Sequence, residues 1–271
     1  MNSQTPKIVR TSTLLEFKRQ GRKIACLTSY DSMTAGVFDR AGIDVLLVGD
    51  SAANTVLGFD STLPITIDEM IPFGRAVAGA SSRALVVIDM PFGSYETGST
   101  GALSNAIQIM KRTNAAAVKL EGGVRSAEQI RNLVEAGIPV MAHIGFTPQS
   151  VNSLGGFKVQ GRGEGAEALI KDALAVEAAG AFAVVLEMVP AELAIEVTKR
   201  LTIPTIGIGA GSGTDGQILV WQDFAGLHSG KTAKFVKQYA QLASILENAT
   251  SEFVSEVQAG TFPSKEHEFG D

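Results

Sequence analysis

"AGIDVLLVG", at Ala41–Gly49, is one of three similar stretches in this chain that together decide the fold. The others are "AGIPVMAHIG" at Ala136–Gly145 and "AGAFAVVLE" at Ala179–Glu187. Each opens with the Ala-Gly pair that commonly ends a helix and continues into a short apolar run. Continuous rather than alternating apolar residues are typical of parallel strands that are buried on both faces. The three stretches therefore predict a repeated unit in which a helix leads into a parallel strand.

The same pattern extends outward from these stretches along most of the chain. The predicted strands are Ile24–Ser29, Val45–Gly49, Ala84–Ile88, Ala116–Leu120, Pro139–Ile144, Ala183–Leu186, Pro204–Ile208 and Ile218–Trp221. The predicted helices between them are Met33–Ala41, Ile67–Gly79, Gly101–Thr113, Ser126–Ala136, Ala166–Ala179 and Ala191–Arg200. Eight strands favour an α/β fold of the TIM (β/α)8-barrel type, although the count alone leaves an open doubly wound sheet as an alternative.

The ends of the chain add helices outside this repeat. A helix predicted at Thr13–Arg19 precedes the first strand and is placed to plug the bottom of the barrel. One or two amphipathic helices are predicted within Lys231–Ala259. Since no linker or low-complexity tract interrupts the 271 residues, we expect a single barrel domain over residues 1–271 with an N-terminal capping helix and a C-terminal helical extension.

Composition excludes several functional classes. The net charge of −5 gives no basic surface for nucleic acid or an anionic membrane. Cys26 is the only cysteine, so neither an internal disulfide nor a cysteine-rich metal site is available. No apolar run approaches the roughly 20 residues of a membrane span, and Met1–Arg10 lacks the apolar core of a signal peptide. These features predict a cytoplasmic protein.

Ionisable side chains stand at the ends of five predicted strands. They are Asp50, Asp89, Lys119 with Glu121, His143 and Glu187, in strand order from the second to the sixth. Because the carboxyl ends of barrel strands meet at one mouth, we expect these side chains to lie close together. Buried carboxylates resist ionisation unless a positive charge balances them. Oxygen donors with one histidine and no cysteine suit a hard cation, Mg²⁺ above all.

Each of these residues also has a purely structural interpretation. Asp50 and Asp89 could cap helices, Lys119 and Glu121 could form an ion pair at the rim, and His143 could be a hydrogen-bonded core histidine. The structural account would have to hold at five corresponding positions, so we favour the shared site.

Glycine-rich and long connecting segments give weaker signals. "GIGAG" at Gly207–Gly211 resembles half of a dinucleotide fingerprint, but it falls late in the chain and lacks the acidic residue that should follow. A tight turn or an anion-accepting nest of backbone N–H groups is the preferred interpretation. The long segments after the second and fifth strands are expected to form binding loops or a lid at the mouth of the barrel.

Several longer strings together resemble the ketopantoate hydroxymethyltransferase family. They are "VGDS" at Val48–Ser51, "STLPIT" at Ser61–Thr66, "VKLEGG" at Val118–Gly123, "HIGFTPQSVN" at His143–Asn152, "GGFKVQGRG" at Gly155–Gly163, "LEMVP" at Leu186–Pro190, "IPTIGIGAG" at Ile203–Gly211, "DGQILV" at Asp215–Val220 and "FPSKEHEF" at Phe262–Phe269. The resemblance runs from about Thr11 to the C-terminus in the family's order, so its specificity is high.

The resemblance implies a TIM barrel of the phosphoenolpyruvate/pyruvate-binding type and a homo-oligomer, in bacterial members a decamer. The implied reaction transfers a hydroxymethyl group from 5,10-methylenetetrahydrofolate to 3-methyl-2-oxobutanoate. Its product is 2-dehydropantoate, on the route to pantothenate and coenzyme A. The implied cofactor is one Mg²⁺ per subunit, and the folate is a co-substrate.

Carried over position by position, the resemblance also assigns roles. Asp50, Asp89 and Glu121 would form the Mg²⁺ shell, directly or through water, and Glu187 would transfer the proton. The expected substrate-binding residues are Asp50, Ser51, Asp89, Lys119 and His143. The chain departs from the family pattern at Ala52–Asn54, Leu57 and Phe59, which bears on loop packing and folate contacts rather than on the metal.

Two alternative functions are weighed against this one. A Mg²⁺-dependent carbon–carbon lyase or mutase of the same barrel type would also use a 2-oxo acid enolate. The isocitrate-lyase branch, however, carries a catalytic loop cysteine, whereas Cys26 lies in the first predicted strand. A non-enzymatic oligomeric scaffold would not need the acidic residues that this chain keeps.

Overall fold

The structure, a computed structural model, describes residues 7–228, 230 and 232–270. Eight parallel strands close into a barrel in which each strand pairs with the next and β8 pairs with β1. The strands are β1 Ile24–Thr28, β2 Val45–Val48, β3 Leu85–Asp89, β4 Ala117–Glu121, β5 Val140–Gly145, β6 Ala183–Glu187, β7 Thr205–Ile208 and β8 Gly216–Leu219. The predicted TIM barrel is confirmed, and the open sheet is wrong.

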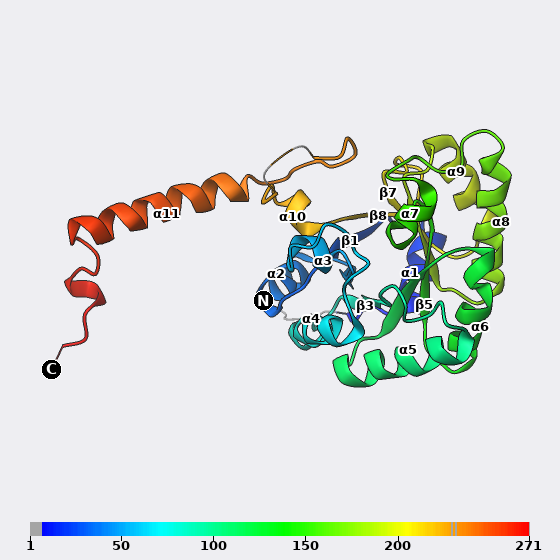
Figure 1. The fold of residues 1–271 in the computed structure, drawn as a ribbon, viewed down its shortest axis with the longest axis horizontal. Helices are drawn as coiled ribbons and strands as arrows, with labels where there is room; N and C mark the ends of the chain where they lie inside the picture. The colour runs from blue at the N-terminus through cyan, green and yellow to red at the C-terminus, as the bar shows by residue number, and fades with distance from the viewer. Residues whose placement is uncertain (1–6, 229, 231, 271) are drawn as a thin grey trace. The chain divides into compact units, whose positions relative to one another are not determined.

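The helices that precede residue 221 lie around the barrel (Figure 1). The longer helices among them are α1 Thr11–Arg19, α2 Ser32–Ala41, α4 Ile67–Ala80, α5 Ser99–Thr113, α6 Ala127–Glu135, α8 Gly165–Ala178 and α9 Ala191–Arg200. Shorter segments are α3 Ala52–Thr55, η1 Val124–Ser126, η2 Pro148–Ser150 and α7 Val151–Leu154. Local signals set the boundaries: Asp31 accepts two backbone N–H bonds at the start of α2, and left-handed Gly42 ends it.

Alternation along the strands determines which residues fill the barrel. Strand residues of the interior cluster occur at every second position, such as Val45 and Leu47 in β2 or Ala183 and Val185 in β6. Leu14 of α1 belongs to the same buried cluster. Continuing the period of two towards the carboxyl ends places Asp89, Lys119, Glu121, His143 and Glu187 on the inner face. The apolar core of the barrel therefore carries a polar layer at its carboxyl end.

The eighth strand differs from the prediction. The sequence pattern placed it at Ile218–Trp221, whereas β8 begins at Gly216, which pairs with Ile24 and Ile206. Gly216 and Gln217 lack the apolar signal of a strand, but a Cβ at Gly216 would lie 2.6 Å from the Ile24 carbonyl oxygen, so glycine fits this tight pairing. Trp221 instead begins a helix.

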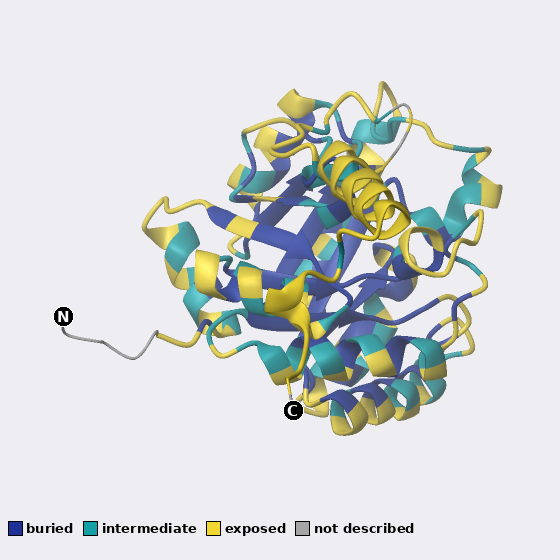
Figure 2. Cartoon of the chain, turned by 90° about the vertical axis from the view of Figure 1, so that its left-hand side faces the viewer, coloured by how far each residue is buried: buried dark blue, intermediate teal, exposed yellow. Residues whose placement is uncertain are grey.

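The chain divides into two compact units, Met1–Val220 and Trp221–Asp271. The second contains α10 Trp221–Phe224, α11 Leu242–Ala259 and η3 Lys265–His267. The description of the whole chain as one barrel domain with a helical extension stays a prediction. Figure 2 shows α11 exposed along its length, in contrast to the buried barrel strands.

The predicted helical region within Lys231–Ala259 is too long at its start. Lys231 lies outside the described residues, and residues 232–241 are not helical. Their backbone is held in another way, because Tyr239 N–H donates to the Phe224 carbonyl and the two rings stack 5.0 Å apart. The helix begins only at Leu242.

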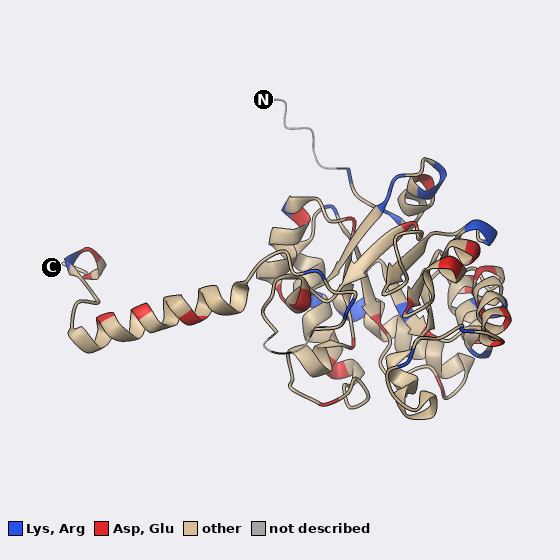
Figure 3. Cartoon of the chain, turned by 90° about the horizontal axis from the view of Figure 1, so that it is seen from above, with Lys and Arg blue, Asp and Glu red and all other residues tan. Residues whose placement is uncertain are grey.

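Charged residues of both signs are interspersed over the outer helices (Figure 3). None of the helices in the described part of the chain has the length and apolar character needed to cross a membrane.

Asp39 of α2 ties that helix to the segment before β3. Its carboxylate is buried and accepts backbone N–H bonds from Ser82 at 3.0 Å, Arg83 at 3.1 Å and Ala84 at 2.6 Å. Burial opposes ionisation, but these hydrogen bonds outweigh it and hold the pKa of Asp39 below its ordinary value.

Asp39→Asn is expected to lower the free energy of unfolding at pH 7 by about 1–3 kcal/mol, because an amide nitrogen would face backbone donors. A lowered folded-state pKa makes the stabilisation by the carboxylate fully present above the ordinary pKa of 3.8 and lost as the pH falls below it. Urea unfolding at pH 7 and at pH 3 should show the difference between variant and wild type narrowing in acid. Asp60→Asn, at an exposed residue of the loop between α3 and α4, serves as the control. An equal difference at both pH values would contradict this account.

Candidate active site

The carboxyl ends of β3 and β4 bring opposite charges together in the barrel interior. Lys119 Nζ lies 2.6 Å from Asp89 Oδ1, and both side chains are about 95% buried. Neighbouring strands impose this contact, since Asp89 and Lys119 are register partners. Burial disfavours the ammonium form of Lys119, but Asp89, Glu121 and Asp50 outweigh that effect and raise its pKa above its ordinary range. Lys119 is therefore a positive charge inside the polar layer, and the alternative of a simple rim ion pair with Glu121 is wrong, because both residues are buried and Lys119 pairs with Asp89.

Asp50 and Ser51 follow β2 directly and face the same region. Asp50 N–H donates to Asp89 Oδ2 at 3.0 Å, and Ser51 Oγ lies 2.8 Å from the Tyr30 hydroxyl. Gly49 makes this turn possible, because a Cβ there would lie 2.6 Å from Ser51 Oγ. Neither aspartate caps a helix: the N-cap of α3 is Ser51, and the N-cap of α5 is Gly98. The helix-cap interpretation of Asp50 and Asp89 is wrong.

His143 connects Lys119 and Glu121 with Glu187. Its Nδ1 is 3.4 Å from both Lys119 Nζ and Glu121 Oε1. Its Nε2 is 3.2 Å from Glu187 Oε2, close enough for an ion pair but not aligned as a hydrogen bond. Burial and the charge of Lys119 oppose protonation, yet the contacts with Glu121 and Glu187 raise the pKa of His143 to about 9. At neutral pH the imidazole is therefore a cation between two carboxylates.

Tyr95 and Gln149 are site residues that the strand-end pattern missed. Gln149 Nε2 donates to Asp50 Oδ2 at 2.8 Å, and its backbone N–H donates to Glu121 Oε2 at 3.0 Å. The Tyr95 hydroxyl donates to Gln149 Oε1 at 2.5 Å and accepts from Glu121 N–H at 3.2 Å. Burial, ahead of nearby carboxylates, raises the pKa of Tyr95 and keeps it protonated. The only sequence signal was that Gln149 falls within "HIGFTPQSVN".

The three predicted metal ligands can be tested by the chemistry of their donors. Burial first, and then the charges of Asp89 and Glu121, raise the pKa of Asp50 to about 8. A divalent cation would relieve this repulsion, and three carboxylates are the hard oxygen donors that Mg²⁺ prefers. In the present arrangement, no group of three or more His, Cys, Asp or Glu side chains within the described residues is positioned to hold a metal ion. The three carboxylates therefore match Mg²⁺ in the type of their donor atoms, whereas their present positions do not form a complete metal site.

A pocket of about 560 Å³ lies beside the ends of β4 and β5, and its lining contains sequence neighbours of the predicted site residues but none of those residues themselves. Its walls include Gly122, which follows Glu121, and Gly145, the register partner of Glu187. The segment after β5 closes one side with Thr147, Ser150 and Ser153. The long segment after the fifth strand therefore lies at the mouth of the barrel, as expected for a binding loop.

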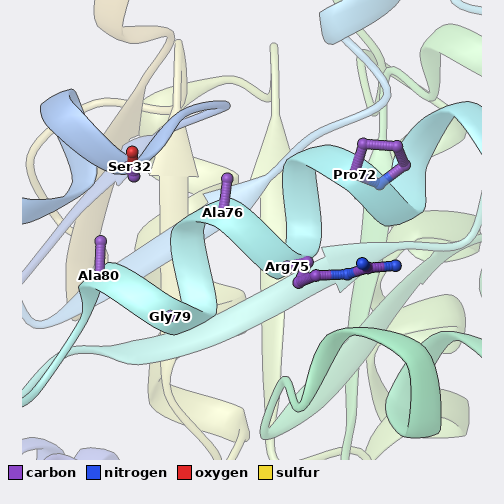
Figure 4. A pocket seen from close by; sticks show the side chains of 6 residues that line it. All are labelled: Ser32, Pro72, Arg75, Ala76, Gly79 and Ala80. Atoms are coloured by element: carbon purple, nitrogen blue, oxygen red, sulfur yellow. The ribbon is translucent and has the colours of Figure 1, made fainter.

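Two other features do not belong to this site. A pocket of about 510 Å³ between α2 and α4 is lined by Ser32, Pro72, Arg75, Ala76, Gly79 and Ala80, none of which is a predicted site residue (Figure 4). The glycine-rich Gly207–Gly211 joins β7 to β8 through a loop without a helix, which removes the helix that a dinucleotide site needs.

Comparisons with known proteins give the family. Residues 8–265 match the family model described as ketopantoate hydroxymethyltransferase. The 3-methyl-2-oxobutanoate hydroxymethyltransferase of Leifsonia xyli subsp. xyli is 61% identical over 98% of this chain and 96% of that protein. The enzyme of the same name from Mycobacterium sp. (strain KMS) is 62% identical over 96% of this chain and 93% of its own length.

Solved structures share the fold at much lower identity. Phosphonopyruvate hydrolase, in a complex with oxalate and Mg²⁺, has a TM-score of 0.62 at 12% identity over 97% of this chain and 92% of that one. The 2,3-dimethylmalate lyase, a member of the PEP mutase/isocitrate lyase superfamily, has a TM-score of 0.58 at 18% identity, and the match covers 97% of this chain and 92% of that one. These likenesses show the same TIM-barrel fold, and the sequence relatives do not favour the lyase or mutase alternative. From a family model that spans nearly the whole chain and from relatives above 60% identity, it follows that this chain is an enzyme of the ketopantoate hydroxymethyltransferase family.

Proposed function

We propose that the polar layer at the carboxyl end of the barrel transfers a hydroxymethyl group from 5,10-methylenetetrahydrofolate to 3-methyl-2-oxobutanoate. The product is 2-dehydropantoate, which commits the carbon skeleton to pantothenate and coenzyme A. The observation that carries the proposal is the buried ion pair of Lys119 with Asp89 among Asp50, Glu121 and Glu187. A permanently charged ammonium group in this position matches a substrate that is an anion and becomes more negative during the reaction.

One Mg²⁺ per subunit would be held by Asp50, Asp89 and Glu121. We propose that these carboxylates bind the cation directly or through water, and that its charge offsets the repulsion of Asp50 by Asp89 and Glu121. Phosphonopyruvate hydrolase, which has the same fold, was solved with Mg²⁺ and oxalate, a small dicarboxylate. When bound, the cation would supply Lewis-acid stabilisation of negative charge on the 2-oxo group.

The side chains around the cation would bind and orient the oxo acid. Lys119 would place a positive charge beside the enolate oxygen as that oxygen becomes negative. Ser51, whose hydroxyl is hydrogen-bonded to Tyr30, would donate a hydrogen bond to the carboxylate of the oxo acid. His143, held as a cation by Glu121 and Glu187, would donate a further hydrogen bond. Lys119 and His143 are buried and held by their partners, so little reorganisation would accompany charge development.

Glu187 is proposed to remove the proton from C3 of the oxo acid. Its carboxylate is 14% exposed, the least buried of the four in the layer, and Oε2 lies 3.2 Å from His143 Nε2. His143 would hold the Glu187 carboxyl in position for the transfer through this contact. The proton can then return to the folate amine as that group leaves.

The folate is proposed to occupy the pocket beside Gly122 and Gly145. Its volume of about 560 Å³ lies within the range of small-molecule sites. Two of its lining residues connect it to the polar layer, because Gly122 follows Glu121 and Gly145 is the register partner of Glu187. A one-carbon unit presented from this side would meet the enolate next to its proposed base.

Assembly and location remain predictions of the sequence. We propose a homo-oligomer, with a decamer as the expected form, in the cytoplasm and without nucleic-acid partners. Support for association comes from the second unit, where α11 exposes large apolar side chains: Ile245, Leu246, Phe253, Val254 and Val257. Such side chains are commonly covered by another polypeptide surface.

The proposed function is tested by hydrogen exchange at C3 of 3-methyl-2-oxobutanoate. The purified enzyme in D₂O should incorporate deuterium only when Mg²⁺ is present, with tetrahydrofolate added to complete the site, because the cation stabilises the enolate. NMR of the methine signal follows the exchange, and addition of 5,10-methylenetetrahydrofolate should convert the oxo acid to 2-dehydropantoate. No exchange with or without Mg²⁺ would exclude this substrate. Exchange without product would exclude the proposed donor.

A further inference from the structure

We propose that Gln149 and Tyr95, called here the Gln149–Tyr95 pair, position Asp50 and Glu121 for the cation. The inference rests on the proposed function, because it assigns to the pair a role in metal affinity. Gln149 lies in η2, directly after β5, and Tyr95 lies between β3 and α5. Both are buried, at 6% and 3% exposure, in the polar layer.

One residue fixes two of the proposed ligands through different atoms. The side-chain amide of Gln149 donates to Asp50 Oδ2 at 2.8 Å, whereas its backbone N–H donates to Glu121 Oε2 at 3.0 Å. The two carboxylates come from the ends of β2 and β4, which are not neighbours in the barrel. The strand register therefore does not set their separation directly, and Gln149 spans it.

The orientation of the Gln149 amide is determined by its partners. Nε2 faces two acceptors, Asp50 Oδ2 and the Met90 carbonyl oxygen at 3.1 Å, while Oε1 faces the Tyr95 hydroxyl at 2.5 Å. A flipped amide would set its oxygen against those two acceptors. Tyr95 completes the ring, because its oxygen accepts from Glu121 N–H at 3.2 Å. All hydrogen-bonding atoms of the amide are thus engaged.

The backbone around the pair is held independently of the cation. Phe146, three residues before Gln149, is fully buried, and its N–H donates to the Glu187 carbonyl oxygen at 2.8 Å. The pair therefore presents a preformed frame to Asp50 and Glu121. Partners that orient metal ligands in this way commonly change metal affinity about 10–100-fold when they are removed.

The test compares Gln149→Met and Tyr95→Phe with the wild type in Mg²⁺ binding. Methionine keeps the length of the side chain and the backbone N–H to Glu121 but frees Asp50. Calorimetry should show Mg²⁺ affinity reduced about 10–100-fold for Gln149→Met and less for Tyr95→Phe, which keeps the bond to Asp50. In turnover assays, the Mg²⁺ concentration for half-maximal rate should rise in parallel. Saturating Mg²⁺ should restore most of kcat, which a general structural defect would not allow.

Gln129→Met is the matched control, since Gln129 is a half-buried glutamine of α6 outside the polar layer. Its half-saturation by Mg²⁺ should equal that of the wild type. If Gln149→Met does not fold, Tyr95→Phe decides the question with a smaller change. If the wild type binds Mg²⁺ and the folded variants bind it with the same affinity, the proposed role of the pair is wrong. The proposed function would remain intact in that case. A wild-type protein that binds no Mg²⁺ would overturn both.

Discussion

Asp50→Asn is expected to abolish Mg²⁺-dependent binding of 3-methyl-2-oxobutanoate while leaving the barrel folded. The variant loses one of three hard ligands and keeps the size of the side chain. Lewis-acid stabilisation contributes several kcal/mol to such a transition state, so kcat/KM should fall by about three orders of magnitude. Folding should be preserved, because burial and the neighbouring carboxylates disfavour the charge that asparagine removes.

Calorimetry with Mg²⁺ and the oxo acid, together with thermal unfolding in the absence of metal, measures both parts of this expectation. We expect a melting temperature equal to or above that of the metal-free wild type. Glu135→Gln, at an exposed residue at the end of α6, is the control. Normal turnover by the Asp50 variant would remove Asp50 from the metal shell.

Glu187→Gln is expected to separate substrate binding from turnover. Glutamine keeps the shape of the side chain and a carbonyl oxygen towards His143, but it cannot accept the C3 proton. Proton transfer by a positioned carboxylate contributes about 10²–10⁴-fold, so kcat should fall by that factor with little change in oxo acid affinity. Deuterium exchange at C3 should decrease equally, because exchange and turnover share this step.

Steady-state kinetics and C3 exchange on the same preparation test this prediction. Glu192→Gln, at an exposed residue in the first turn of α9, is the matched control. A folded Glu187→Gln variant that turns over at the normal rate would show that Glu187 is not the proton acceptor, whether or not its deuterium exchange at C3 has fallen.

The sequence predicted the barrel and the location of the site for one common reason. Parallel strands buried on both faces leave continuous apolar runs, and the first polar side chain after each run marks the carboxyl end. Asp89, Lys119 and Glu187 could be recognised in this way because each stands within or directly after such a run. The start of β8 was missed because Gly216 and Gln217 pair through their backbones and carry no apolar signal.

The partners of these side chains could not be predicted in the same way. A rim ion pair of Lys119 with Glu121 was an alternative that the sequence left open, whereas the register of β3 and β4 sets Lys119 against Asp89. Gln149 contacts Asp50 and Glu121 from a single 3-10 turn, and Tyr95 contacts Glu121 from a loop. No periodicity indicates the direction of a side chain in such short segments.

The sequence by itself thus determined the number and direction of the strands and the set of charges at their carboxyl ends. Only the tertiary structure decided which charge faces which, how His143 becomes a cation between Glu121 and Glu187, and that Gln149 spans Asp50 and Glu121. The physical reason is that strand periodicity is a local property of the backbone. Ion pairs, pKa shifts and amide orientation depend instead on distances between residues far apart in the chain, and these are set only when the barrel closes.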